Sequence, residues 1–157
     1  MRSDRVGMVL LAALVATATD AIADERRHAV YVEVLGKGGA WGAGYDWAIS
    51  PRLAIGTVAS FAPLDGQRVY SLSPYLSVVP LGRGVHRWFI DVGPQLVHLS
   101  TPSPVPEWNG MSSSGIGAQA SSGYERRGHV LLRFYGQVVA GRNGAAPWLG
   151  ASLGWTL

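Results

Sequence analysis

The chain has 157 residues, enough for a single domain, and 48% of them are hydrophobic while only 15% are charged. Cysteine is absent, which excludes disulfides and thiolate metal sites. The formal charge is +3, but the basic residues are scattered along the chain and form no basic helix, so we expect no nucleic-acid partner.

The N-terminus predicts an export signal. Two arginines precede the apolar stretch Val6–Ala18, and Ala21–Ala23 follows as a small-x-small cleavage site. An uncleaved membrane anchor is disfavoured because the apolar stretch is short and a good cleavage site follows it. We therefore expect residues 1–23 to be a secretory signal peptide and residues 24–157 to form the mature domain.

Beyond the signal, apolar and polar residues alternate in eight stretches that turn residues separate. Alternation with a period of two gives each strand one apolar face and one small or polar face. No internal stretch reaches the roughly 20 apolar residues of a membrane helix. We expect strands near His28–Leu35, Ala40–Ile49, Arg52–Phe61, Arg68–Val79, Val85–Ser100, Met111–Tyr124, His129–Gly141 and Ala145–Leu157.

This pattern predicts an all-β fold, an eight-stranded antiparallel up-and-down transmembrane β-barrel. The connections after the second, fourth and sixth strands are short, and those after the third and fifth are longer or richer in proline. Outer-membrane barrels have short periplasmic turns, longer external loops and both termini on the inside. The short first connection, Gly36–Gly39, departs from that pattern. It lacks the spacing of a phosphate-binding loop, so we expect a hairpin turn.

Two prolines, Pro74 and Pro94, fall in the middle of expected strands, where each removes a ladder hydrogen bond. A β-bulge would absorb such a proline and would shift the alternation of faces beyond it. The prediction of which side chains point outward and which point inward is therefore least constrained after these two positions.

Aromatic residues on the apolar faces fall near strand ends, as membrane-interface belts require. An aromatic core of a soluble sandwich would not cluster them there. The expected periplasmic belt holds Trp47, Trp88, Tyr124 and Trp155, and the expected external belt holds Trp41, Phe61 and Tyr70.

The opposite faces carry Gly, Ser, Gln and a few charges, which predicts a packed polar lumen without a pore. Unpaired lumen charges are costly, so we expect an ion-pair network that holds the barrel shut, in which Arg133 pairs with Asp91 or Glu33. A catalytic acid–base pair is disfavoured because a plugged lumen offers no substrate access. The expected network comprises Glu33, Asp46, Asp91, Arg133, Arg87 and Arg52.

The last nine residues alternate apolar side chains with Gly, Ser or Thr and end in Leu-x-Trp-x-Leu. Together with Tyr31–Gly38, this end resembles small outer-membrane β-barrel proteins of the OmpA/OmpX-like kind. That family's final strand is read by the outer-membrane assembly machinery and usually ends in Phe. The resemblance assigns this role to Leu153, Trp155 and Leu157, although Leu157 departs from the family pattern. It implies a place in the bacterial outer membrane of a Gram-negative cell, with lipid, lipopolysaccharide and the assembly machinery as partners.

The middle of the chain is also similar to outer-membrane lipid A deacylases, over Ser71–Tyr75 and through Phe89–Gly93. Those enzymes carry a His-x-Ser pair on a late strand, with a carboxylate that orients the His. By strand order these positions fall at Gly136 and Val138, which cannot act as base or nucleophile. The alternative catalytic set in this chain is His98, Ser100 and Glu107.

The sequence therefore predicts an integral outer-membrane barrel with a structural or surface-contact role and no catalysis. The first alternative is the lipid A deacylase-like esterase. The second is an exported soluble lipocalin-like binding barrel, which would need an apolar lumen and a charged exterior. We expect no cofactor and no metal, because the remaining histidines, His28, His86 and His129, show no ligand spacing with any carboxylate.

Overall fold

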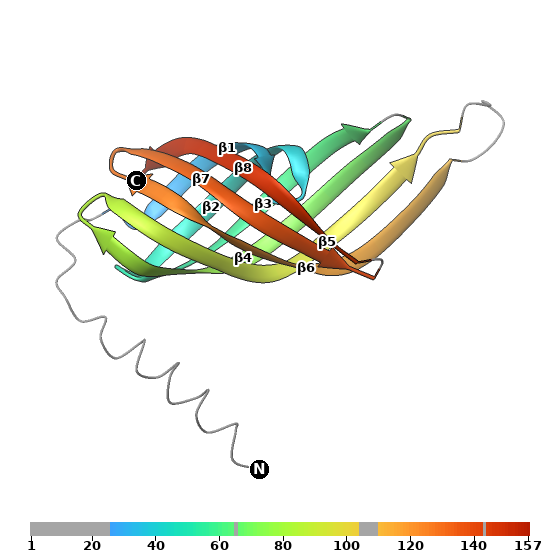
Figure 1. The fold of residues 1–157 in the computed structure, drawn as a ribbon. Helices are drawn as coiled ribbons and strands as arrows, with labels where there is room; N and C mark the ends of the chain where they lie inside the picture. The colour runs from blue at the N-terminus through green and yellow to red at the C-terminus, as the bar shows by residue number, and fades with distance from the viewer. Residues whose placement is uncertain (1–25, 65, 104–109, 143) are drawn as a thin grey trace, which may run out of the picture.

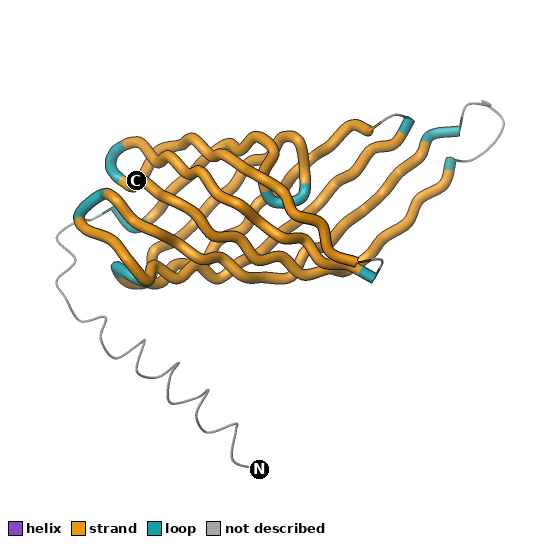
Figure 2. The backbone as a smooth tube through the Cα atoms, viewed as in Figure 1, coloured by secondary structure: helices purple, strands orange, loops and turns teal. Residues whose placement is uncertain are grey.

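The computed structural model describes residues 26–64, 66–103, 110–142 and 144–157. The expected signal peptide and Glu107 lie outside these ranges. The regular elements of the described part are all β-strands, drawn orange in Figure 2. The described residues contain no helix that is long and apolar enough to cross a membrane. The strands are β1 (His28–Gly36), β2 (Gly39–Ser50), β3 (Leu53–Leu64), β4 (Gln67–Arg83), β5 (His86–Thr101), β6 (Met111–Arg127), β7 (Val130–Gly141) and β8 (Gly144–Thr156).

Each strand pairs antiparallel with its neighbours in sequence, and β8 pairs with β1, so the sheet closes into a barrel (Figure 1). The predicted fold class is confirmed. The β1–β8 pairing, which we call the seam, is short and joins Ala29–Val34 to Ala151–Thr156. In contrast, β5 pairs with β6 over the whole of His86–Thr101. We call the end that holds the start of β1 and the end of β8 the terminal end, and the other the distal end.

Side chains alternate between the outside and the lumen because successive residues of a strand point to opposite faces. On β1, Val30 and Val32 are exposed while Tyr31 and Glu33 are buried. The same alternation on the other strands makes the outside apolar and the lumen polar. The charged side chains buried in the lumen are Glu33, Lys37, Asp46, Asp91, Glu125, Arg127 and Arg133.

Neither mid-strand proline shifts the facing. Pro74 stays in register with β3 and Pro94 with β6, and the residue after each proline is buried as the simple alternation requires. Neither position has a bulge, because a proline that faces outward loses one ladder bond without adding a residue. The register shifts instead lie between Ala48 and Ser50 and between Val78 and Leu81.

Three strands run further than the turn residues predict. β3 continues through Pro63 to Leu64. β4 continues through Pro80–Gly82 to Arg83, and the register shift after Val78 absorbs the proline. β6 continues to Arg127, so the residues Glu125–Arg127 belong to the strand and not to a turn. The side chains of Glu125 and Arg127 have partners across the lumen, which favours strand pairing over a solvated turn.

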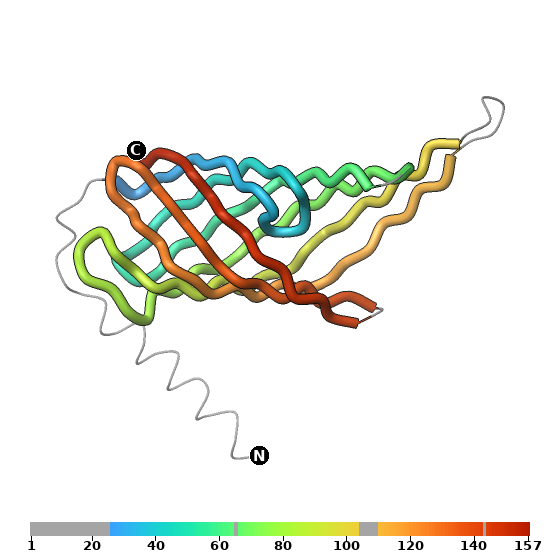
Figure 3. The backbone as a smooth tube through the Cα atoms, turned by 45° about the horizontal axis from the view of Figure 1, so that its top comes forward, coloured from blue at the N-terminus to red at the C-terminus, as the bar shows by residue number. Residues whose placement is uncertain are grey.

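At the distal end, β3–β6 extend beyond the other strands, as Figures 1 and 3 show. β6 pairs with β7 only from Ala118 onward, so Met111–Gly117 has a strand partner on its β5 side alone. We call Val97–Thr101 of β5 with Met111–Gly117 of β6 the β5–β6 projection.

Candidate functional site: the filled lumen

The turn between β1 and β2 folds back into the lumen (Figure 3), so that Lys37 at its tip is fully buried. The Lys37 carbonyl accepts hydrogen bonds from Ser60 Oγ at 2.9 Å and Ser73 Oγ at 3.3 Å. Gln137 Nε2 donates to the carbonyl of Gly36 at 2.8 Å. The turn needs glycine at Gly38, whose φ of 91° lies in the left-handed region. Polar side chains from β3, β4 and β7 thus hold this turn inside the barrel. The turn, Gly36–Gly39, closes the lumen there, and we call it the plug turn, or the plug.

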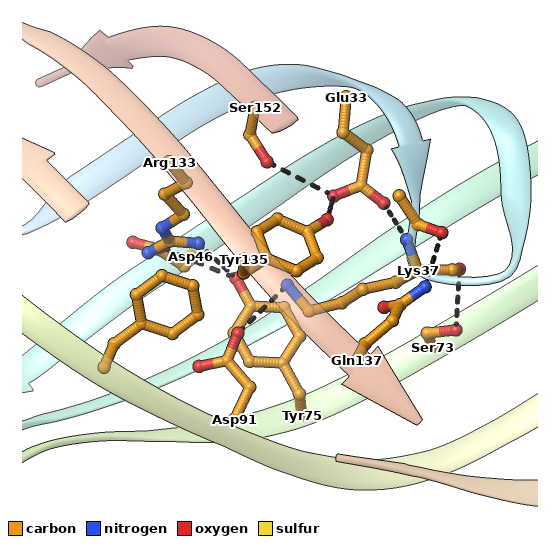
Figure 4. A network of polar contacts seen from close by, with 12 residues as sticks. Glu33, Lys37, Asp46, Ser73, Tyr75, Asp91, Arg133, Tyr135, Gln137 and Ser152 are labelled. Atoms are coloured by element: carbon orange, nitrogen blue, oxygen red, sulfur yellow. Dashed lines mark hydrogen bonds and ion pairs between the residues drawn. The ribbon is translucent and has the colours of Figure 1, made fainter. Parts of the chain in front are cut away.

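The Lys37 ammonium group lies among one carboxylate and two aromatic rings (Figure 4). Its Nζ is 3.0 Å from Asp91 Oδ2 of β5. It also lies 4.3 Å from the ring centroid of Tyr75 and 4.9 Å from that of Tyr135. A buried charge needs such partners because it has lost its water shell. The plug is therefore fastened by its side chain as well as by its backbone.

Glu33 of β1 joins the plug to the strands across the seam. Its Oε1 accepts a hydrogen bond from the backbone N–H of Lys37 at 2.6 Å. Its Oε2 accepts from Tyr135 Oη of β7 at 2.8 Å and from Ser152 Oγ of β8 at 3.4 Å. One carboxylate therefore links the first strand, the last two strands and the inserted turn.

A second cluster fills the terminal half of the lumen around Arg133 of β7. Its Nη2 is 2.5 Å from Asp46 Oδ2 and also contacts Glu125 Oε2, to which its Nε donates at 2.6 Å. Arg127 Nη1 lies 2.8 Å from Asp46 Oδ1. The predicted pairing of Arg133 with Asp91 or Glu33 is wrong. Asp91 pairs with Lys37, and Glu33 accepts hydrogen bonds from Tyr135 and Ser152.

The remaining two arginines of the predicted network lie at its margin. Arg87 is 20% exposed, and its Nε is 3.8 Å from Glu125 Oε1. Both residues line a small pocket at the terminal end, together with Arg127 and Arg133. The Arg52 side chain is exposed and takes part in none of the ion pairs among the described residues, so its expected place in the network is wrong. It sits at the β2–β3 turn, beyond the reach of the lumen carboxylates.

Three inward tyrosines each lie over a glycine of the neighbouring strand. The paired residues are directly opposite in register, and a Cβ on the glycine would collide with the ring. Small and large side chains thus interlock across the lumen, as close packing requires. The pairs are Tyr31 with Gly44, Tyr75 with Gly56, and Tyr135 with Gly150.

Sequence reasoning missed three charged members of the lumen, namely Lys37, Glu125 and Arg127. All three belong to stretches that have the composition of turns, and Lys37 and Arg127 stand next to glycine. For Lys37 a signal existed, because it is the only lysine of a chain whose other cations are arginines. For Glu125 and Arg127, their parity with the inward residues of β6 could have placed them in the lumen.

The residues of the predicted aromatic belts all lie on the outer face. Trp41, Phe61 and Tyr70 are opposite one another on β2, β3 and β4 toward the distal end, and the Phe61 and Tyr70 ring centroids are 5.2 Å apart. Toward the terminal end, Trp88 and Tyr124 are paired on β5 and β6. Trp47 and Trp155 lie at this end on β2 and β8.

The residues of the expected assembly signal form the terminal part of the seam strand. Leu153, Trp155 and Leu157 are exposed on the outer face. The backbone of Leu157 exchanges hydrogen bonds with His28, with N···O distances of 2.8 and 3.2 Å. Recognition by the assembly machinery stays a prediction.

The alternative catalytic residues are only partly described. His98 Nδ1 is hydrogen-bonded to Ser114 Oγ of β6 at 2.9 Å, and not to Ser100. Ser100 lies two residues further along β5, opposite Ser112. Its side chain therefore points to the same face of the sheet as that of His98. Glu107 lies outside the described residues. A hydroxyl–imidazole pair can move a proton, but the described residues supply no carboxylate to orient this imidazole.

A metal centre is not evident in the part of the chain that the structure describes, which holds no group of three or more His, Asp or Glu side chains suited to an ion. The histidines contact aromatic or polar neighbours instead. His28 Nδ1 is 2.6 Å from Tyr45 Oη, His86 Nδ1 is 2.6 Å from Tyr124 Oη, and His129 Nε2 is 2.8 Å from Arg26 Nη2.

Comparison with known proteins supports the fold. No family model matches the chain, and no curated protein matches it. The chain is similar to the crystal structure of the N-terminal β-barrel domain of Pseudomonas aeruginosa OprF, with a TM-score of 0.62, 11% identity and coverage of 83% of this chain and 95% of that one. It is also similar to Neisserial surface protein A, with a TM-score of 0.53, 12% identity and coverage of 83% and 93%. The expected likeness to lipid A deacylases stays a prediction.

Proposed function

We propose that this chain is an integral β-barrel of the bacterial outer membrane, with a closed lumen and a structural or surface-contact role. One observation carries the proposal: the apolar side chains face outward around the barrel while ion pairs and hydrogen bonds fill its interior. Large exposed apolar surfaces mark contact with lipid or with another protein. A soluble lipocalin-like barrel would require the opposite arrangement.

The apolar band has a height suited to a bilayer. On β5 the outward residues Trp88, Ile90, Val92 and Leu96 are large and apolar. Pro94 stands between the last two on the same face. At about 3.3 Å per residue and a tilt of about 40°, this run covers roughly 20 Å along the barrel axis, close to the ~25 Å band of such barrels. The OprF barrel and Neisserial surface protein A are outer-membrane proteins, which supports the same location.

Cell fractionation and gel migration test the location. The protein is expected in the outer-membrane fraction, and it is expected to migrate faster unboiled than boiled, because a closed barrel resists detergent until heated. Recovery as a soluble periplasmic protein without a heat-dependent shift would contradict the proposal.

Conductance in a planar lipid bilayer tests the closed lumen. Because the plug turn and the Arg133 cluster fill the interior, we expect no steady single-channel current from the folded barrel. Stable openings by the unmodified chain would show that the lumen conducts and would contradict a purely structural role.

The β5–β6 projection is the part of the barrel that we propose to face the cell exterior and to make surface contacts. Membrane-impermeant maleimide tests this orientation, because the chain has no native cysteine. Ser113→Cys on the projection is expected to label on intact cells. Arg52→Cys at the terminal end is the matched control and is expected to label only after the outer membrane is opened. The reverse pattern would invert the proposed orientation.

A further inference from the structure

The outer face of the terminal end carries three basic side chains in one row. Arg83 of β4 is opposite His86 of β5, and His86 is opposite Arg126 of β6. Residues opposite one another share a face, and the outward Trp88 lies two positions from His86, so the row faces outward. All three side chains are exposed. We call Arg83, His86 and Arg126 the basic row.

The described residues provide no carboxylate to neutralise the basic row. The acidic side chain nearest in sequence, Glu125, points inward and contacts Arg133. No ion pair of the described chain includes Arg83 or Arg126. Arg83 and Arg126 lie on either side of His86, so an anion from outside the chain that lies over the row can accept hydrogen bonds from both guanidinium groups. The described acidic residues, all buried in the lumen, are Glu33, Asp46, Asp91 and Glu125.

An aromatic pair lies directly above the basic row on the same face. Trp88 and Tyr124 are paired in register two residues from His86 and Arg126. His86 stacks on Tyr124 with ring centroids 6.0 Å apart, and its Nδ1 is 2.6 Å from Tyr124 Oη. This hydrogen bond fixes the imidazole and leaves Nε2 for a ligand. Aromatic rings of this kind prefer the depth of lipid headgroups, so the basic row sits where phosphates lie.

We propose that the basic row binds the phosphate of an anionic phospholipid in the adjacent leaflet, an inference that rests on the proposed membrane location. Arginine forks present pairs of N–H donors that match phosphate oxygens. Free phosphate offers the same acceptors. The row, however, lies on the outer wall beside Trp88, and not in a pocket, so a lipid whose acyl chains pack on the apolar band is the favoured source.

Native mass spectrometry of the barrel in a non-ionic detergent tests the proposal with phosphatidylglycerol as the probe and phosphatidylcholine as the neutral comparison. Retention of phosphatidylglycerol over phosphatidylcholine is expected. Each arginine near an anionic lipid contributes about fivefold, so Arg83→Gln with Arg126→Gln is expected to weaken binding about 25-fold. Arg52→Gln is the matched control, because Arg52 is exposed at the same end but outside the row. It is expected to leave retention unchanged.

If Arg52→Gln lowers phosphatidylglycerol retention as much as the double variant does, binding depends on the total positive charge at this end and the proposal is overturned. Unchanged retention in the double variant would also overturn it. Displacement of the lipid by millimolar inorganic phosphate would overturn a lipid source. The heat-dependent gel shift is read on every sample. A shifted barrel without lipid preference overturns this inference alone, whereas a wild-type chain without a shift overturns the proposed function.

Discussion

Replacing Lys37 with Met tests how the plug turn is held. The substitution keeps the apolar stem and removes the ammonium group 3.0 Å from Asp91 Oδ2. At this distance two unit charges attract by about 5.5 kcal/mol at an effective dielectric constant of ~20, and desolvation offsets much of that. The variant leaves Asp91, which is 1% exposed, as an unpaired buried charge. Losing one partner of a buried pair typically costs about 3–5 kcal/mol, and we expect the free energy of unfolding to fall by that amount.

Urea titration of the barrel folded in detergent micelles measures the change, with tryptophan fluorescence as the signal and the gel shift as a second probe. The chain has six tryptophans. Adding Asp91→Asn to Lys37→Met removes the stranded charge, so the double variant is expected to be more stable than Lys37→Met alone. Arg142→Met is the control, an exposed cation at the distal end whose loss is expected to change stability by less than about 0.5 kcal/mol. A cost below about 1 kcal/mol for Lys37→Met, or a double variant as unstable as the sum of the single changes, would refute the reasoning.

Arg133→Gln removes the cation that Asp46 and another buried carboxylate share, so it is expected to cost about 3–5 kcal/mol in the same titration, and Asp46→Asn is expected to restore part of the loss. Gly150→Val drives two methyl groups into the Tyr135 ring, and overpacking of this kind is expected to cost about 1–3 kcal/mol; an unchanged midpoint would show that the ring moves freely. For the hydroxyl next to His98, mass spectra of lipid A from cells that express the wild-type chain or Ser114→Ala are expected to be identical. Loss of one acyl chain in the wild-type sample alone would establish an esterase.

Strand alternation was readable from the sequence because each residue's face depends only on local parity. The strand order of the barrel followed from the short connections between neighbours. The lumen partners were not readable, because a pairing such as Lys37 with Asp91 depends on where a turn lies in space. Gly36–Gly39 has the composition of an ordinary hairpin turn, and nothing local says that it enters the barrel. The parity of Arg133 predicts that it points into the lumen, but the choice between the four buried carboxylates requires the positions of four other strands.

The seam also sets the order of events during assembly. Ala29 and Thr156 are partners from opposite ends of the barrel chain, and the entropy lost in bringing such distant residues together is about 4 kcal/mol, roughly twice that of a ten-residue loop. The seam ladder is short, so its backbone hydrogen bonds recover little of this cost. The hydrogen bonds that Glu33 accepts from Tyr135 and Ser152 join β1 to β7 and β8, so they form only when the barrel closes. Polar contacts in the lumen therefore stabilise the closed barrel and not the open sheet. A chain that lacks this carboxylate would lose both of these contacts between the first strand and the last two, so closure of the barrel would gain less free energy.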